Sequence, residues 1–184
     1  VPQDRPLCIL FICTANVCRS PLAEAFMAKH VRAAGATMQV ASASVHDQIR
    51  STHPLVIQIL SEQQLTPRRT NSQPLSNDLV KAADLIVTMT GAHAISVAGK
   101  FRDSRANVFV LDHLVQLMRP MAANETLDDW LADMRRQPRM YPNHPGAQDI
   151  TDPVDKDEET FRSIAAQIDG LTEQLARSFV SGPA

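Results

Sequence analysis

The fold is decided by residues Leu7–Pro21, LCILFICTANVCRSP. The first part, Leu7–Ile12, is a continuous run of six apolar residues, which is typical of a strand buried on both faces of a parallel sheet. Cys13 follows directly. Further along, Ser20 is suited to cap a helix and Pro21 is favoured as the first helical residue. The stretch therefore predicts a buried strand, a tight loop and a helix that begins at Pro21.

The spacing between Cys13 and Arg19 suits an anion. Five intervening residues let the loop curl so that its backbone N–H groups point inward, and the helix near Ser20 adds the positive end of its dipole. The Arg19 guanidinium can close this cradle with a planar fork that matches two phosphate oxygens. The same positive field favours the thiolate form of Cys13. The sequence thus predicts a nucleophilic cysteine beneath a bound phosphate.

Apolar segments further along the chain predict the rest of the sheet. Short apolar runs indicate strands near residues 38–43, 83–89 and 107–111, and segments with helical spacing separate them. The closing segment, 158–180, carries its apolar residues on one helical stripe. Strands that alternate with helices predict an α/β, Rossmann-like, three-layer single domain, with a four-stranded parallel sheet flanked by helices.

The segment Cys13–Pro21 resembles the signature loop of the low-molecular-weight protein tyrosine phosphatases of bacterial type. That pattern is a cysteine, five residues and Arg-Ser, usually with a Gly-Asn pair inside. Ala15 stands where the family often has glycine, so the loop is expected to shift slightly, because glycine adopts positive φ more readily. The resemblance implies that Cys13 is the nucleophile and Arg19 the phosphate clamp. The other loop residues that it implies in substrate binding are Thr14, Ala15, Asn16, Val17, Cys18 and Ser20.

Two segments outside the loop also resemble the family. Asp149–Pro153, DITDP, resembles the loop that brings a general acid over the phosphate. The aspartate before the proline is Asp152, which the resemblance implies as proton donor to the leaving oxygen and then as base for water. The first aspartate of the segment is expected to be structural. Ser42 matches a serine that supports the loop through a hydrogen-bond network with Asn16 and Ser20.

The resemblance implies metal-independent hydrolysis of a phosphotyrosine protein or a small phosphomonoester through a phosphocysteine intermediate. No cofactor is expected, and no residue is assigned to a metal. Val17 bears on the substrate, because the tyrosine phosphatases of the family usually have an aliphatic residue there and the related arginine phosphatases have threonine. An aliphatic side chain suits a phenyl ring better than a guanidinium, whose donors it leaves unsatisfied. We therefore expect a preference for phosphotyrosine over phosphoarginine.

Two other functions stay open on the sequence. Relatives of this fold reduce arsenate with the same cysteine, but they commonly carry resolving cysteines well downstream. This chain has no cysteine after Cys18, so arsenate reduction would need a small thiol as partner. The other alternative is an oxyanion-binding regulatory module that has lost turnover.

Cys18 is also near enough in sequence to trap an oxidised Cys13 as a disulfide.

Length and composition bound the remaining choices. A chain of 184 residues with 44% hydrophobic and 21% charged residues suits one domain over 1–184. A proline-rich stretch at 137–145 and a length greater than is usual in the family suggest an insertion within 119–146.

A formal net charge of −2 argues against a nucleic-acid partner. With no segment that predicts a membrane span or a signal peptide, a cytoplasmic protein without a membrane partner is expected. A tyrosine kinase stays open as a partner.

The histidines receive no functional role from the sequence. None of the six has the spacing of metal ligands or a neighbouring pattern typical of catalysis. His93 is expected in a turn before a short helix at 94–98. No residue of the polar stretch 70–73 is assigned to the site either.

Overall fold

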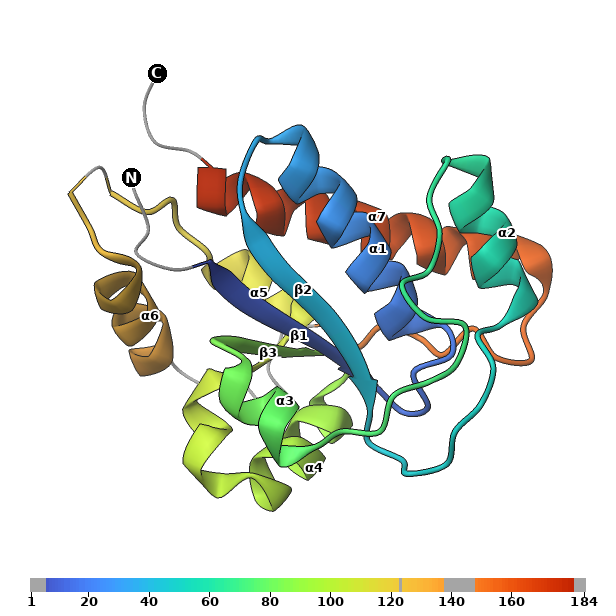
Figure 1. The fold of residues 1–184 in the computed structure, drawn as a ribbon, viewed down its shortest axis with the longest axis horizontal. Helices are drawn as coiled ribbons and strands as arrows, with labels where there is room; N and C mark the ends of the chain where they lie inside the picture. The colour runs from blue at the N-terminus through green and yellow to red at the C-terminus, as the bar shows by residue number, and fades with distance from the viewer. Residues whose placement is uncertain (1–5, 123, 138–147, 181–184) are drawn as a thin grey trace.

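A four-stranded parallel sheet in the order β2-β1-β3-β4 forms the centre of the structure (Figure 1). The structure is a computed structural model that describes residues 6–122, 124–137 and 148–180. The strands are β1 (Leu7–Cys13), β2 (Met38–Ser44), β3 (Leu85–Thr88) and β4 (Val108–Val110). The parallel four-stranded sheet predicted from the sequence is confirmed.

Helices cover both faces of the sheet, which confirms the predicted three layers (Figure 1). The buried apolar side chains form two clusters, a larger core on one face of the sheet and a smaller core on the other. The helices that pack on the larger core are α1 (Arg19–Ala33), α2 (Pro54–Glu62), α5 (Leu111–Leu117), α6 (Leu127–Arg136) and α7 (Glu158–Val180). Those on the smaller core are α3 (Asn77–Ala82) and α4 (Gly91–Lys100), and a 3₁₀ turn, η1 (Arg102–Asn107), leads into β4. None of these described helices is long and apolar enough to cross a membrane.

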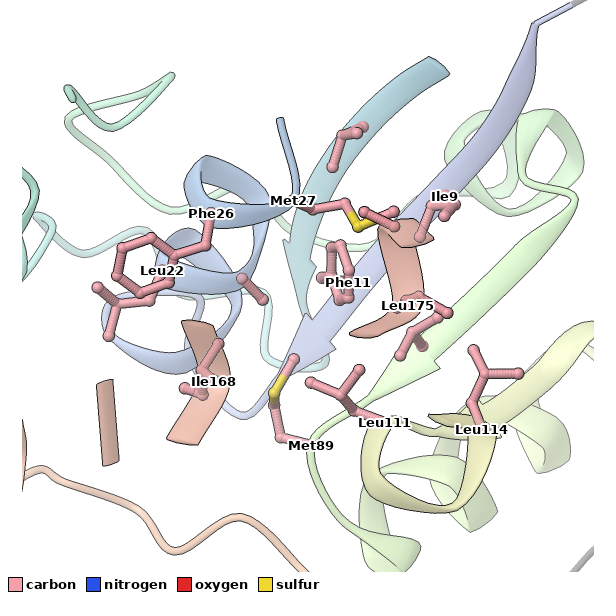
Figure 2. Close-up of a cluster of buried hydrophobic side chains, with 14 of the residues drawn as sticks. Ile9, Phe11, Leu22, Phe26, Met27, Met89, Leu111, Leu114, Ile168 and Leu175 are labelled. Carbon is pink, nitrogen blue, oxygen red and sulfur yellow. The ribbon is translucent and has the colours of Figure 1, made fainter. Parts of the chain in front are cut away.

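The alternation of side chains along β1 decides which face Cys13 occupies. Ile9 and Phe11 belong to the larger core, where α1 and α7 pack (Figure 2), while Leu10 and Ile12 belong to the smaller core. Because successive residues of a strand point to opposite faces, Cys13 shares the face of Phe11. The strand therefore delivers the cysteine side chain beneath the start of α1.

Segments from distant parts of the chain lie beside the loop at the carboxyl ends of β1, β2 and β3. Beyond β2, the Val45 amide donates to the Cys13 carbonyl at 3.1 Å. Beyond β3, the Met89 amide donates to the Ile12 carbonyl at 3.1 Å, and the Met89 carbonyl accepts from the Ile150 amide at 2.9 Å. These bonds dock the segment that contains Asp152 beside the loop, as expected for sites at the carboxyl ends of parallel strands.

Several boundaries differ from the sequence predictions. The helix expected at 94–98 begins at Gly91 instead, because the Thr90 hydroxyl caps it by accepting from the His93 amide at 3.2 Å. The last strand is shorter than 107–111, because η1 occupies residue 107 and α5 begins at residue 111. Helix α6 lies within 119–146; residues 138–147 lie outside the described part of the chain, so the insertion stays a prediction.

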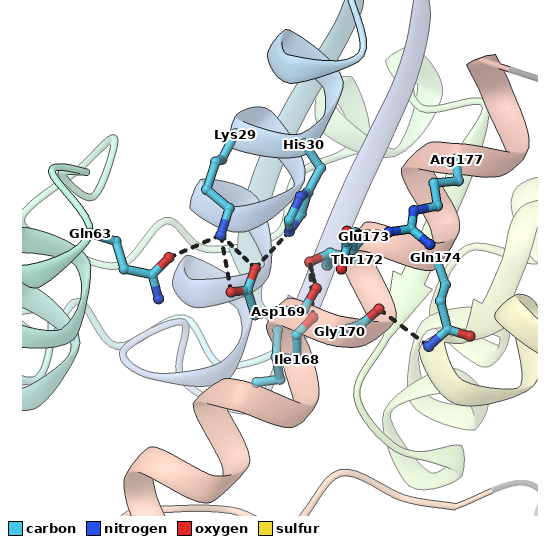
Figure 3. Close-up of polar contacts among 10 residues, drawn as sticks. All are labelled: Lys29, His30, Gln63, Ile168, Asp169, Gly170, Thr172, Glu173, Gln174 and Arg177. Carbon is cyan, nitrogen blue, oxygen red and sulfur yellow. Dashed lines mark hydrogen bonds and ion pairs between the residues drawn. The ribbon is translucent and has the colours of Figure 1, made fainter.

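Asp169 of α7 joins that helix to α1 through Lys29 and His30 (Figure 3). Its carboxylate lies 2.9 Å from Lys29 Nζ and 2.6 Å from His30 Nε2. The Lys29 ammonium also donates to Gln63 Oε1 at 2.9 Å. All three members of the cluster on α1 and α7 are partly buried, so this contact is less screened by water than a surface ion pair.

We expect Asp169→Asn to lower the free energy of unfolding by about 1–2 kcal/mol, because it leaves Lys29 without its charged partner. Glu173→Gln is the matched control on the same helix. Its partner Arg177 is 72% exposed, so that change should cost less than about 0.5 kcal/mol. Urea unfolding of the two variants measures the difference, and equal losses would contradict a role for Asp169 in holding the helices together.

Candidate active site

The loop between β1 and α1 turns so that Ser20 faces the cysteine. Helix α1 begins at Arg19, and Cys18 at its N-cap position makes no side-chain cap. The prediction that Ser20 caps a helix beginning at Pro21 is therefore wrong. The Ser20 hydroxyl is instead 3.0 Å from Cys13 Sγ, inside the first turn of the helix.

Cys13 is buried and surrounded by donors. Its side chain is 3% exposed, and its Sγ accepts from the Asn16 amide at 3.3 Å. Because a thiolate only accepts hydrogen bonds, the neighbouring Ser20 hydroxyl donates to it when the cysteine is ionised. The loop thus supplies two donors to the charged form of the sulfur.

Asn16 is the residue on which the turn depends. Its φ is 54°, whereas Ala15 is not among the residues with positive φ. The left-handed position of the turn is therefore occupied by Asn16, and asparagine tolerates this region better than most residues. Ala15 does not need positive φ, so the backbone gives no reason for the shift expected there. Asn16 Nδ2 donates to Ser20 Oγ at 2.9 Å and to Ser42 Oγ at 2.8 Å.

Two residues that the sequence left without a role complete this network. Asn16 Oδ1 accepts from the Gln73 amide at 2.9 Å. The Ser42 hydroxyl donates to Glu24 Oε2 at 2.5 Å. Glu24 is only 6% exposed, and burial raises the pKa of its carboxyl. An acidic residue on the buried face of α1 was a signal for such a role, whereas Gln73 acts through its backbone and gives no signal in its side chain.

Arg19 links the loop to the segment that precedes α7. Its side chain is 4% exposed, and its Nη1 donates to the Ile150 carbonyl at 3.0 Å. Its Nη2 donates to Thr14 Oγ1 at 3.1 Å and forms an ion pair with the Asp152 carboxylate. The buried Nε has no hydrogen-bond partner among the described residues. A buried guanidinium donor left over in this way suits an oxyanion.

Asp152 reaches the loop from a segment that is itself anchored. Its side chain is 46% exposed, and its Oδ1 accepts from the Val154 amide at 3.3 Å. Asp149 points elsewhere, because its Oδ1 accepts from the Gly91 amide at 2.7 Å at the start of α4. The two aspartates of DITDP thus differ in position: one meets Arg19, and the other fixes the segment to α4.

The other loop residues lie at the edges of the cradle. Val17 is half-buried against the larger core, and its carbonyl accepts from the His53 amide at 3.0 Å. Cys18 is buried, and this burial raises the pKa of its thiol to about 12. Across the residues that the structure describes, no group of three or more His, Cys, Asp or Glu side chains could hold a metal ion.

His93 belongs to the site although the sequence gave it no role. Its Nε2 lies 2.8 Å from Thr14 Oγ1. Burial and, secondarily, the charge of Arg19 lower the pKa of this histidine to about 4. The contact joins residues 79 positions apart in the chain, and no local pattern predicts such a pair.

The loop thus holds a buried cysteine that faces an amide and a hydroxyl, together with a buried arginine that pairs with an aspartate. This arrangement is suited to the chemistry of a cysteine-dependent phosphatase. The family model described as low molecular weight phosphotyrosine protein phosphatase matches residues 8–129. The chain belongs to this family, and it is a protein phosphatase whose mechanism is of the phosphocysteine type.

Curated relatives carry three kinds of name. A protein-arginine-phosphatase of Bacillus subtilis is 34% identical over 108 residues, which are 58% of this chain and 71% of that protein. Wzb, a low molecular weight protein-tyrosine-phosphatase of Escherichia coli, is 23% identical and covers 92% of this chain and 93% of its own. An arsenate reductase of Brevibacillus brevis is 34% identical over 89 residues, 48% of this chain and 62% of its own.

Solved structures agree with the fold over nearly the whole chain. A mutant of YwlE from Bacillus subtilis has a TM-score of 0.72 and 25% identity, with coverage of 93% of this chain and 97% of that one. A second structure, described as YwlE arginine phosphatase with a phosphorylated active-site serine, has a TM-score of 0.73 and 25% identity and covers 93% and 94%. Both neighbours support the α/β assignment.

We expect peroxide to inactivate the protein reversibly, because a sulfenic acid at Cys13 can condense with the Cys18 thiol. A thiol with a pKa of about 12 is mostly protonated at neutral pH, so disulfide formation should accelerate as the pH rises. Stopped-time peptide mapping between pH 6.5 and 8.5 measures this rate. In Cys18→Ser, the same dose should give loss that reductant does not reverse, and equal recovery of both proteins would leave Cys18 a packing residue.

Proposed function

We propose that the protein is a metal-independent protein tyrosine phosphatase in which Cys13 is the nucleophile, Arg19 the phosphate clamp and Asp152 the general acid and base. The observation that supports this most strongly is the placement of Cys13 Sγ, 3.0 Å from the Ser20 hydroxyl and 3.3 Å from the Asn16 amide. These two groups can donate to the sulfur when it carries negative charge, as the nucleophile and again as the leaving group.

In the first half-reaction, the Cys13 thiolate attacks phosphorus and an S–P bond forms as the P–O bond to the leaving group breaks. Asp152 gives its proton to the leaving oxygen. Arg19 and the loop amides hold the equatorial oxygens of the transferring group. In the second, the Asp152 carboxylate takes a proton from water as the water oxygen attacks phosphorus. The S–P bond then breaks, and the Ser20 hydroxyl stabilises the thiolate that leaves.

The ion pair between Arg19 and Asp152 fits this sequence of steps. Without substrate, the carboxylate neutralises a buried guanidinium that would otherwise lack a counter-charge. A phosphate dianion can replace it as the partner of the Arg19 fork. Asp152, which is 46% exposed, is then released; it takes a proton from solvent and gives that proton to the leaving oxygen. Asp152 therefore competes with the substrate phosphate for Arg19 before it acts as the general acid.

Apolar residues in the loop and on the segments that follow β2 and Asp152 support phosphotyrosine as the substrate. Val17 is aliphatic, and Ile49 and Val154 are exposed large apolar residues on the two segments that follow β2 and Asp152. Such surfaces suit a phenyl ring, whereas a guanidinium needs acceptors. Phosphoarginine is the second candidate, because the relative from Bacillus subtilis is named a protein-arginine-phosphatase.

The remaining alternatives have less support. The arsenate reductase relative matches only 48% of this chain, and the chain holds no cysteine beyond Cys18. An oxyanion-binding module without turnover would not need a general acid, yet Asp152 contacts Arg19 directly. We further propose a cytoplasmic phosphotyrosine protein as substrate, made by a tyrosine kinase that would be the partner enzyme.

We expect the protein to hydrolyse phosphotyrosine peptides with EDTA present, and with a higher kcat/KM than matched phosphoarginine peptides. The reason is the aliphatic side chain of Val17 in the loop, with the exposed apolar residues Ile49 and Val154 on the segments that follow β2 and Asp152. Stopped assays of released phosphate measure both rates, and Cys13→Ser is the control that should lose turnover with either substrate. A higher kcat/KM for phosphoarginine would overturn the substrate assignment, and full activity of Cys13→Ser would overturn the covalent mechanism.

We expect Asp152→Asn to slow substrates in proportion to the basicity of the leaving group. Proton donation is worth about a hundred- to ten-thousand-fold where it is needed. The variant should also bind inorganic phosphate more tightly than the parent protein, because Arg19 loses a competing anion. A series of aryl and alkyl phosphates, with phosphate inhibition measured alongside, tests both effects. Equal losses across the series would remove Asp152 from the acid role.

A further inference from the structure

The hydroxyl of Thr14 is held by two side chains at once. Arg19 Nη2 donates to its Oγ1 at 3.1 Å, and His93 Nε2 lies 2.8 Å from the same oxygen. His93 comes from the first turn of α4, and α4 follows β3, the strand beside β1. The topology of the sheet therefore brings a histidine to the second residue of the loop.

The donors and acceptors of Thr14 can be counted. A threonine hydroxyl has one proton and two acceptor lone pairs. A guanidinium only donates, so Arg19 occupies one lone pair. His93 then either donates to the second lone pair or accepts the only proton. If His93 donates, the Thr14 hydroxyl keeps its proton for a further acceptor. If His93 accepts, that proton is used.

The surroundings of His93 favour the donating form. The side chain is buried, at 8% exposed, and its pKa of about 4 keeps it neutral near pH 7, with one N–H. Its Nδ1 has no hydrogen-bond partner within the described part of the chain. A buried N–H without an acceptor is rarer in proteins than an acceptor without a donor, so the proton belongs on Nε2.

We propose that His93 is a positioning residue that donates its Nε2–H to Thr14 and so directs the Thr14 hydroxyl proton toward a phosphate oxygen of the substrate. The inference deepens the proposed function and rests on it. Because Arg19 Nη2 contacts both Thr14 and Asp152, the Thr14 hydroxyl lies beside the general acid. His93 itself does not touch the reacting atoms and acts through Thr14.

The tautomer of His93 gives a direct test on the unmodified protein. Two-dimensional ¹H–¹⁵N spectra of the imidazole distinguish a neutral ring protonated on Nε2 from one protonated on Nδ1. We expect the Nε2–H form between pH 6 and 8, with a shift of its signals when vanadate is added. The Nδ1–H form would overturn the proposal, because Thr14 would then spend its proton on His93. This readout needs no turnover, so it is separate from the fate of the proposed function.

Variants test whether His93 acts through Thr14. We expect His93→Phe and Thr14→Val each to weaken inhibition by inorganic phosphate by about tenfold, the effect of losing one well-placed hydrogen bond. The double variant should be no weaker than Thr14→Val, because the two residues serve the same contact. His93→Gln, which offers an amide N–H, should recover most of the affinity. Losses that multiply in the double variant, or no recovery in His93→Gln, would overturn the proposal, and thermal unfolding of each variant controls for folding.

Discussion

The left-handed backbone of Asn16 is the constraint on which the rest of the site depends. At φ 54° the chain reverses so that the Asn16 amide points at Cys13 Sγ. The side chain of the same residue then bonds Ser20, Ser42 and the backbone of Gln73. One residue thus fixes the loop to α1, to β2 and to the segment before α3. An apolar side chain in the same turn would leave these buried polar groups without partners, which costs more than the lost bonds themselves.

The burial of charge explains why the site needs so many supporting contacts. Arg19 is 4% exposed and Glu24 is 6% exposed, and neither position is favourable for an ion that lacks partners. Arg19 is balanced by Asp152 and by the Ile150 carbonyl. Glu24 accepts from Ser42, but burial outweighs this hydrogen bond and raises the pKa of the carboxyl. The loop of Cys13 therefore carries one buried positive group, Arg19, whereas the buried acid Glu24 meets the loop only through Ser42.

The sequence was most informative where a segment carries its own physical signal. The apolar run of β1 predicted the central strand. The motifs around Cys13 and Asp152 predicted the loop and the segment Asp149–Pro153 that lies beside it. It was least informative about the direction of individual groups. The start of α1 could not be read locally, because Ser20 turns toward Cys13 rather than toward the helix amides. His93 and Gln73 were missed because their contacts, across 79 and 57 residues, exist only once β1, β2 and β3 have paired.

The loop is therefore held on two flanks by different means. From the β2 flank, Asn16 connects to Ser42 and Glu24 through side-chain hydrogen bonds. From the α4 flank, Thr14 connects to His93. Neither flank includes Ile49 and Val154, the exposed apolar residues on the segments that follow β2 and Asp152. In the proposed mechanism the loop holds the phosphate and the neighbouring segments meet the leaving group. Those segments can therefore change without disturbing the positions of Cys13 and Arg19. This separation gives a physical reason why the chain can resemble relatives named protein-tyrosine-phosphatase, protein-arginine-phosphatase and arsenate reductase at once.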